Sequence, residues 1–213
     1  MIEPLLLDTK LTNHQHKSLV DFYNDYEKNI NEWVYYDNTH LLKDTKTSIY
    51  SRGRKALMLD NISNLKLQQT LQEIKENIFK SNNFNKDKFK EIKNMEPDSA
   101  LYPTLFSCIY STSLQEGVGR GVHTHNDPRG QNNEIQVRFN FLVQKSAEGG
   151  EPVVNSRLIN LTEKDGMILF ASEWKHSAMP VQGNTARVLL SIGYLVDYDY
   201  AKELEKRFVS RDD

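Results

Sequence analysis

Side chains that bind metals form an ordered set in the C-terminal half of the chain. His125 and Asp127 lie two residues apart, and His176 follows from a later segment. On extended backbone, residues two apart point to the same side, so the His125 imidazole and the Asp127 carboxylate share a face. A second imidazole, from His176, would complete a set of two histidines and one carboxylate. Such a set suits Fe(II) and leaves positions open for a co-substrate and O2.

Arg187 adds a group that recognises carboxylates. It opens the strongly apolar segment Arg187–Tyr194, where a guanidinium needs an anionic partner. Its planar fork suits the far carboxylate of a dicarboxylate co-substrate. Ser191 lies on the same face by alternation and offers a hydroxyl deeper along the strand. Gly193, also on that face, either leaves room for a ligand or marks a bulge.

Three further polar residues have two interpretations each. Arg138 and Asn140 alternate with apolar residues, so they point to one side of their strand. That side is either a solvated face or a barrel interior, where Asn140 binds the co-substrate and Arg138 binds a substrate anion. Tyr110 is either a core residue or a phenol hydrogen-bonded to the co-substrate carboxylate.

Residues in loops around the metal set are candidates for substrate contacts. Arg120 and Arg129 flank the His125–Asp127 motif and could hold a negative group on the substrate. Trp174, close to His176, is either a packing residue or part of a pocket wall.

A different ligand set is also open. His123 and His125 are two residues apart and share a face in the same way. With His176 they would form a three-histidine site of the kind that holds zinc or a cupin metal. Asp127 would then be a turn residue or a support for the ligands.

Composition limits the class of protein. The chain has 213 residues, is 38% hydrophobic, and carries a formal net charge of −2 with a pI near 6.3. This length predicts one domain, and the acidic balance argues against a nucleic-acid partner. No apolar run is long enough for a membrane span, and the first residues lack the basic region of a signal peptide. A single cysteine, Cys108, fits a reducing cytoplasm.

Two kinds of secondary structure are expected. Residues 1–100 predict helices and extended segments. One helix is indicated by side chains at helical spacing, namely Leu19, Tyr23, Tyr26 and Ile30, and Thr12 or Asn13 caps its start. A second helix is indicated by apolar residues at the same spacing, namely Leu67, Leu71, Ile74 and Ile78. Residues 101–197 predict short strands, at Leu105–Ser111, Ile135–Val143, Arg157–Leu161, Met167–Ala171, Ala178–Gln182 and Ala186–Val196. Residues 198–213 return to helix. Regularly spaced short strands with turn signals indicate a sandwich or barrel in a mainly β, α+β domain.

The stretch from Leu105 to Val196 resembles the iron(II)/2-oxoglutarate-dependent oxygenases, particularly their prolyl-4-hydroxylase-like branch. The resemblance rests on the ordered set His125-Asn126-Asp127, Val137–Val143, Glu163–Phe170, His176 and Thr185–Ser191. The segment Val137–Asn140 is also similar to the aspartyl/asparaginyl hydroxylase branch.

The resemblance implies a double-stranded β-helix (jelly roll, cupin-like) with N-terminal helices packed on one sheet. It implies Fe(II) bound by His125, Asp127 and His176, with 2-oxoglutarate pairing with Arg187 and O2 as oxidant. Ascorbate would serve as a reductant. The expected reaction is hydroxylation of a C–H bond in a small-molecule or peptidyl substrate, with release of succinate and CO2. Because related halogenases lack the carboxylate, Asp127 favours hydroxylation or another oxidation over halogenation.

The chain departs from the family's pattern at two points. Many relatives have a serine two residues after the arginine, where this chain has Leu189, so Ser191, Tyr110 or Asn140 would supply the second hydrogen bond. The stretch between Tyr110 and His125 is also long. Two other classes remain, a cupin-like metalloenzyme that does not use 2-oxoglutarate and a non-catalytic β-sandwich binding module.

Overall fold

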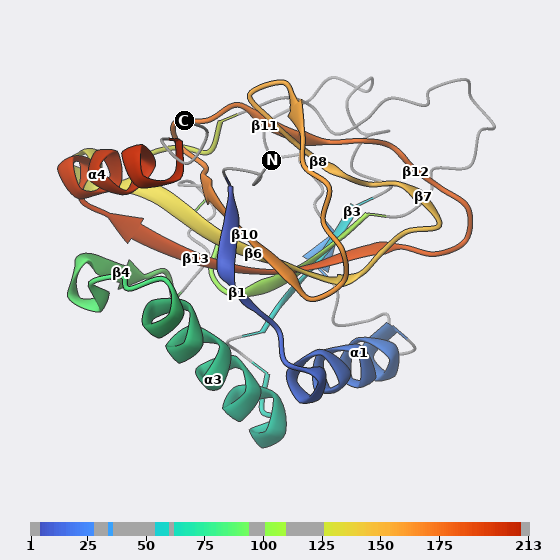
Figure 1. Ribbon diagram of the computed structural model, residues 1–213. Coiled ribbons are helices and arrows are strands. Elements are labelled where there is room, and N and C mark those ends of the chain that lie inside the picture. The colour runs from blue at the N-terminus through green and yellow to red at the C-terminus, as the bar shows by residue number, and fades with distance from the viewer. Residues whose placement is uncertain are drawn as a thin grey trace.

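The computed structural model describes residues 5–27, 34–35, 54–59, 62–93, 101–109 and 126–209. The protein is mainly β with antiparallel sheets, and the described ranges contain three α-helices (Figure 1). The helices are α1 (Asn13–Glu27), α3 (Leu65–Ser81) and α4 (Tyr198–Val209). Short 3-10 turns span Lys86–Lys88 and Gln131–Asn133. This mixture agrees with the mainly β, α+β class expected from the sequence.

One large sheet carries most of the strands. Its order is β1-β10-β6-β13-β5-β3-β2, and β4 also pairs with β13. The bounds are β1 (Leu6–Lys10), β2 (Val34–Tyr35), β3 (Arg54–Met58), β4 (Phe89–Glu91), β5 (Leu105–Ile109), β6 (Ile135–Gln144), β10 (Asp165–Phe170) and β13 (Arg187–Val196). Two small sheets have the orders β11-β8-β9 and β12-β7. Their strands are β7 (Glu148–Gly149), β8 (Pro152–Val154), β9 (Arg157–Leu158), β11 (His176–Ala178) and β12 (Val181–Gln182).

Helix α1 begins where the sequence predicts. The Thr12 hydroxyl accepts a hydrogen bond from the Gln15 backbone N–H at 3.2 Å, and the Gln15 side chain accepts one from the Thr12 N–H at 3.0 Å. This reciprocal pair satisfies two donors at the helix start, as in a capping box. Leu19 and Tyr23 are buried, which confirms the predicted apolar face. Of the two remaining predicted residues, the Tyr26 side chain and Ile30 lie outside the described part of the chain.

Helix α3 also confirms its predicted face. Asn64 caps it by accepting a hydrogen bond from the Leu67 N–H at 2.9 Å. The four apolar residues at helical spacing are all at most 1% exposed: Leu67, Leu71, Ile74 and Ile78. Their burial supplies the main energy that holds this helix on the sheet.

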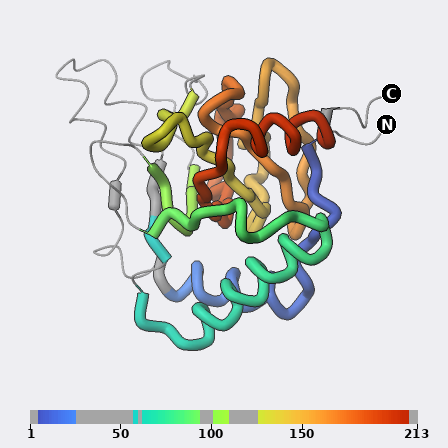
Figure 2. The backbone as a smooth tube through the Cα atoms, turned by 90° about the vertical axis from the view of Figure 1, so that its left-hand side faces the viewer, coloured from blue at the N-terminus to red at the C-terminus, as the bar shows by residue number. Residues whose placement is uncertain are grey.

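Helices α1 and α3 cover one face of the large sheet. Phe139 of β6 and Tyr194 of β13 lie on this face and meet Phe79 of α3, with ring centroids 6.4 and 5.5 Å from it. Phe106 of β5 meets Tyr23 of α1 edge-on at 6.2 Å. Figure 2 shows α1 and α3 side by side below the sheet and α4 above. The N-terminal helices therefore pack on one sheet, as expected.

The opposite face of the large sheet is termed the inner face below. Because strand residues alternate, Arg138 and Asn140 of β6 point there, together with Arg187 and Ser191 of β13. Register places Ser191 directly opposite Asn140. Ile109, paired with Arg187, packs against Ala178 and Val181, so the inner face looks toward the small sheets.

Three strand predictions were wrong in extent. The expected strand Ala178–Gln182 is divided into β11 and β12, because Pro180 has no N–H for a ladder. The strand expected at Arg157–Leu161 ends at Leu158. β10 begins at Asp165, earlier than expected, and β1 is an edge strand that the sequence did not reveal.

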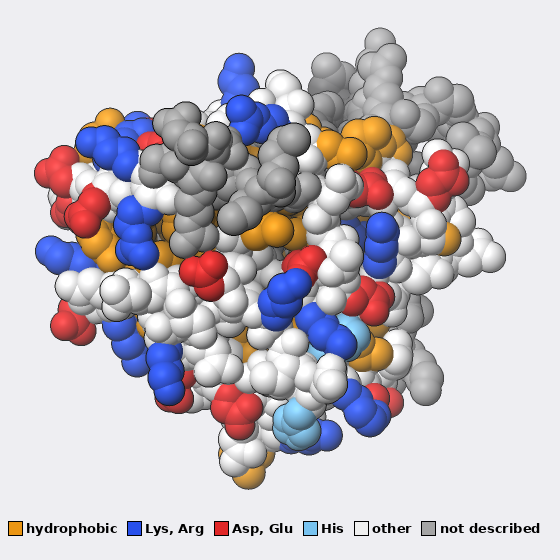
Figure 3. Space-filling model, viewed as in Figure 1, with side chains coloured by type: hydrophobic (Ala, Val, Ile, Leu, Met, Phe, Trp, Pro, Cys, Tyr) orange, Lys and Arg blue, Asp and Glu red, His pale blue; other side chains and the backbone are white. Residues whose placement is uncertain are grey.

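No helix within the described ranges is long and apolar enough to cross a membrane. Acidic and basic side chains are interspersed on the face of the molecule seen in Figure 3.

Candidate metal centre

Asp127 is held at the end of β10. Its backbone N–H donates to the Ala171 carbonyl at 2.7 Å, and the Ala171 N–H donates in turn to Gln136 of β6 at 2.8 Å. The residue is 4% exposed. A carboxylate is costly to bury unless charges or hydrogen bonds compensate it, so this position calls for cationic neighbours.

His176 begins β11 and faces that carboxylate. Its Nδ1 lies 3.0 Å from the Trp174 carbonyl, an acceptor, so Nδ1 carries the proton in this bond. Its Nε2 lies 3.6 Å from Oδ1 of Asp127. Metal-bound histidines use their second ring nitrogen in this way, because the bond to a carbonyl fixes the tautomer and ring orientation.

The donor set fits a divalent cation. Two donors each bound about 2.0–2.2 Å from one ion lie roughly 3–3.5 Å apart, close to the 3.6 Å between Nε2 of His176 and Oδ1 of Asp127. Imidazole and carboxylate are also the ligands that non-haem Fe(II) accepts. Within the described residues no group of three His, Cys, Asp or Glu side chains could hold a metal, and His125, the expected third ligand, lies outside them.

Arg138 approaches the other oxygen of the same carboxylate. Its Nη1 is 3.6 Å from Oδ2 of Asp127, and its side chain is 12% exposed. The guanidinium also lies over the Tyr102 ring, 5.0 Å from the centroid. The two oxygens of Asp127 therefore face different partners, His176 and Arg138. Arg138 belongs to the inner face, so the interpretation of its side as solvated was wrong.

Arg187 lies on the inner face near the small sheets. It is 5% exposed, and its Nη1 donates to the Gly150 carbonyl at 3.2 Å. Gly150 has a φ of +81°, and a Cβ there would crowd Arg187 and Val181. Glycine therefore lets the turn after β7 close on the arginine.

Ser191 and Asn140 form a polar pair further along the inner face. Both are buried, and the Ser191 hydroxyl has no hydrogen-bond partner among the described residues. Leu189, between Arg187 and Ser191 on this face, is buried against Leu142 and Ser107 in register. The position two residues after the arginine is therefore apolar. Ser191 is the nearest described hydroxyl along β13, and the nearer amide on β6, that of Gln144, already donates to the Ala186 carbonyl at 3.0 Å.

Gly193 does not leave room for a ligand. A Cβ on Gly193 would fall within the van der Waals radius of the Tyr102 carbonyl oxygen and would also crowd Ile92. The segment at Tyr102 crosses the sheet there, so the space that the sequence indicated is filled by the protein itself. Gly193 is regularly paired with Arg138, so it is not a bulge either.

Arg129 and Trp174 are joined to helix α4 instead of lying with Arg138. Arg129 donates to Glu173 at 2.6 Å and to Asn133, and its guanidinium lies 5.4 Å from the Tyr198 ring centroid. Trp174 is 6% exposed, and its indole N–H donates to Glu205 at 2.6 Å. Trp174 is thus a packing residue.

The ion pairs around Glu173 are reflected in pKa values. Burial acts to raise the pKa of Glu173, but Lys202 and Arg129 outweigh it and hold the pKa below its ordinary value. The hydrogen bond with Glu205 raises the pKa of Lys202. Both groups are therefore charged at neutral pH.

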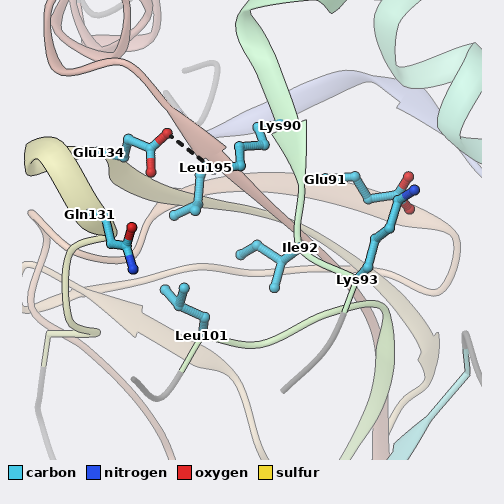
Figure 4. A pocket seen from close by; sticks show the side chains of 8 residues that line it. All are labelled: Lys90, Glu91, Ile92, Lys93, Leu101, Gln131, Glu134 and Leu195. Atoms are coloured by element: carbon cyan, nitrogen blue, oxygen red, sulfur yellow. Dashed lines mark ion pairs between the residues drawn. The ribbon is translucent and has the colours of Figure 1, made fainter. Parts of the chain in front are cut away.

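A hollow of about 470 Å³ lies next to the turn at Gln131–Asn133 (Figure 4). None of the predicted site residues lines it; the lining residues are Lys90, Glu91, Ile92, Lys93, Leu101, Gln131, Glu134 and Leu195. Glu134 points toward Lys90 across its upper edge, with a charge separation of 3.7 Å. The apolar floor is formed by Ile92, Leu101 and Leu195.

Four predicted site residues lie outside the described residues: His123, His125, Tyr110 and Arg120. Sequence reasoning missed three residues that contact predicted site residues. The Tyr102 ring lies under the Arg138 guanidinium, the Gly150 carbonyl accepts from Arg187, and the Glu173 carboxylate accepts from Arg129. The paired glycines at 149 and 150 were a visible turn signal, but nothing local linked them to Arg187.

Comparison with known proteins adds evidence on the fold. No family model matches the chain, and no curated protein matches it. Among solved structures, a prolyl-4-hydroxylase from Pseudomonas putida is 11% identical, with 88% of this chain and 89% of that chain covered and a TM-score of 0.53. A prolyl hydroxylase from Trichoplax adhaerens, solved with a peptide fragment of the hypoxia inducible factor oxygen degradation domain, is 9% identical, with 93% and 85% covered and a TM-score of 0.59.

The chain has the fold of the prolyl hydroxylases. At this level of identity the likeness concerns the fold alone.

Proposed function

We propose that this protein is an Fe(II)- and 2-oxoglutarate-dependent dioxygenase on a jelly-roll fold, and that it hydroxylates its substrate. The observation that carries the proposal is the His176 imidazole facing the buried Asp127 carboxylate at 3.6 Å, with Nδ1 tied to a backbone carbonyl. The shared fold with prolyl hydroxylases makes the same reaction class the natural choice.

In this proposal His125, Asp127 and His176 hold the iron. When bound, iron together with 2-oxoglutarate and O2 supplies the oxidising power for C–H hydroxylation, and succinate and CO2 are released. The contribution of the protein is placement. The Trp174 carbonyl holds the His176 ring in one orientation, and Arg138 stands against Oδ2 of Asp127, so Oδ1 is the oxygen left to face the metal.

The inner face supplies the groups for 2-oxoglutarate. Arg187 is buried, always charged and able to bind a carboxylate through two parallel hydrogen bonds. The Ser191 hydroxyl and the Asn140 amide lie in register with each other, four residues further along β13, and offer further hydrogen bonds. Apolar neighbours such as Leu189 exclude water from the co-substrate and strengthen these interactions.

The substrate is a small polar molecule or a residue within a peptide. The Trichoplax adhaerens neighbour was solved with a peptide fragment, which favours the peptidyl option. A cytoplasmic location fits a chain with one buried cysteine.

The direct test is 2-oxoglutarate turnover. Purified protein supplied with Fe(II), ascorbate and 2-oxoglutarate should release succinate slowly even without substrate, and a panel of peptides and amino acids should accelerate it. Asp127→Ala and His176→Ala should abolish release. A parent protein that binds one iron per chain but shows no effect of 2-oxoglutarate on turnover or stability would contradict the proposal.

A three-histidine cupin-like site is the rival, and metal content separates the two. If His125, Asp127 and His176 bind the metal, Asp127→Ala loses it and His123→Ala keeps it. The rival site predicts the reverse. A non-catalytic binding module predicts no stoichiometric metal in the parent protein.

A further inference from the structure

We propose that helix α4 positions two loops through a charged network, namely the loop after Asp127 (residues 127–133) and the loop before His176 (residues 172–175). We propose also that this network tunes metal affinity. The inference rests on the proposed function, because it assigns these residues a role toward the metal. The network consists of Arg129, Glu173 and Trp174 from the loops and Tyr198, Lys202 and Glu205 from α4.

The first loop enters the network two residues after Asp127. Arg129 donates to Glu173 at 2.6 Å and lies over the Tyr198 ring, so it reaches both the second loop and the helix. It also donates to Asn133, at the end of its own loop. These contacts fix the backbone that leads out of the Asp127 position.

The second loop enters just before His176. Glu173 accepts from Arg129 and forms an ion pair with Lys202 at 3.0 Å, so one carboxylate joins the loop after Asp127 to α4. The next residue, Trp174, donates its indole N–H to Glu205 at 2.6 Å and packs its ring on Phe170 at 4.7 Å. Lys202 closes the network with a 2.7 Å bond to Glu205.

The connection to the metal ligand is short. The carbonyl of Trp174 is the acceptor that fixes His176 Nδ1. Locking the Trp174 ring against α4 therefore locks the orientation of the imidazole. Arg129 and Glu173 hold the two loops at a fixed separation, and that separation sets the distance from His176 Nε2 to Asp127 Oδ1. Groups that orient metal ligands typically change metal affinity about 10- to 100-fold when they are removed.

This assignment gives Arg129 and Trp174 a positioning role in place of a contact with substrate. It also explains why the C-terminal helix, remote in sequence from the loops at 127–133 and 172–175, carries the partners of both. Partly exposed ion pairs of this kind add little to global stability, so their effect should appear in the geometry of the site.

The chain offers a matched control at the other end of β10. Asp165 begins that strand and Glu173 follows its end; their side chains are 10% and 14% exposed. Each carboxylate pairs with a lysine, Lys10 or Lys202, and each has a lowered pKa. Asp165→Asn and Glu173→Gln therefore each remove a partly buried carboxylate charge that is paired with a lysine, but only the second touches the network.

The test is Co(II) binding to the apoprotein, followed by calorimetry and by the visible absorption of the bound ion. Glu173→Gln should weaken binding about 10-fold or more and shift the absorption bands, whereas Asp165→Asn should match the parent. Lys202→Arg should retain parental affinity and Lys202→Met should not. Trp174→Phe, which keeps an aromatic ring but deletes the indole N–H, should give an intermediate loss.

Hydrogen exchange provides a second readout. Binding of Co(II) should slow exchange of α4 amides in the parent and much less in Glu173→Gln, because coupling between two sites is reciprocal. Parental Co(II) affinity and parental absorption in Glu173→Gln would overturn the inference while leaving the proposed function intact. Absence of Co(II) binding in the parent itself would overturn both.

Discussion

Replacement of Arg187 by alanine should weaken 2-oxoglutarate binding steeply. Arg187 is 5% exposed, and its Nη1 donates to the Gly150 carbonyl. In the proposed function this buried guanidinium binds the far carboxylate of 2-oxoglutarate. Loss of one charge-assisted bidentate pair costs roughly 2–3 kcal/mol, which corresponds to about a 30- to 150-fold rise in Kd.

The assay is the thermal shift produced by 2-oxoglutarate under nitrogen, with Mn(II) in place of iron so that no turnover occurs. At a concentration 100 times Kd the co-substrate stabilises the parent by about 2.7 kcal/mol. For the variant at the same concentration the gain falls to about 0.3–0.9 kcal/mol. In a domain of this size 1 kcal/mol moves Tm by about 2–4 °C, so a shift of about 5–11 °C should fall to about 1–4 °C.

Arg157→Ala is the control, because Arg157 is an exposed arginine on β9 and its loss removes the same charge. It should leave the shift unchanged. If Arg187→Ala shows the parental shift, the co-substrate carboxylate does not bind at Arg187 and the reasoning from burial and charge fails.

Gly193→Ala should destabilise the fold by about 3 kcal/mol or more, measured by urea unfolding, because the new methyl group would overlap the Tyr102 carbonyl; a parental midpoint would show that the crossing segment moves at no cost. Asp165 has a lowered folded pKa: burial opposes the shift, but the hydrogen bond from Lys10 and those from Thr162 outweigh it. Its contribution to stability is therefore complete above pH 3.8, the unfolded value, and is lost as pH falls through the lower folded value. Asp165→Asn should therefore lose less stability on acidification than the parent, as measured by denaturation at a series of pH values. Cys108 is fully buried and should resist alkylation until the protein unfolds, which mass spectrometry can follow.

The sequence predicted best those features that local periodicity controls. Leu67, Leu71, Ile74 and Ile78 recur at helical spacing and are buried together, because a helix on a sheet needs such a stripe. The alternation at Arg138 and Asn140 correctly placed them on one face. Alternation alone could not say which face, because that depends on which side of the sheet the helices cover.

Features that depend on contacts distant in sequence could not be predicted. The Tyr102 carbonyl occupies the space beside Gly193, and Tyr102 lies far from Gly193 along the chain. The role of Arg129 is decided by Glu173 and Tyr198, and no local pattern pairs those residues. Asp127 and His176, the proposed metal ligands, were expected to lie together because their residue types restrict the chemistry more than their positions do, and their side chains lie 3.6 Å apart.

The pairing of β1 with β10 has a consequence for how the chain reaches its native state. Leu6 lies in register with Met167, so β1 is synthesised roughly 160 residues before the strand that it pairs with. Until β10 has been synthesised, the backbone N–H and C=O groups of β1 form hydrogen bonds with water, or β1 is bound by chaperones. This edge of the sheet therefore cannot form until β10 has emerged, and a nascent chain halted before that point should remain open to proteolysis at β1.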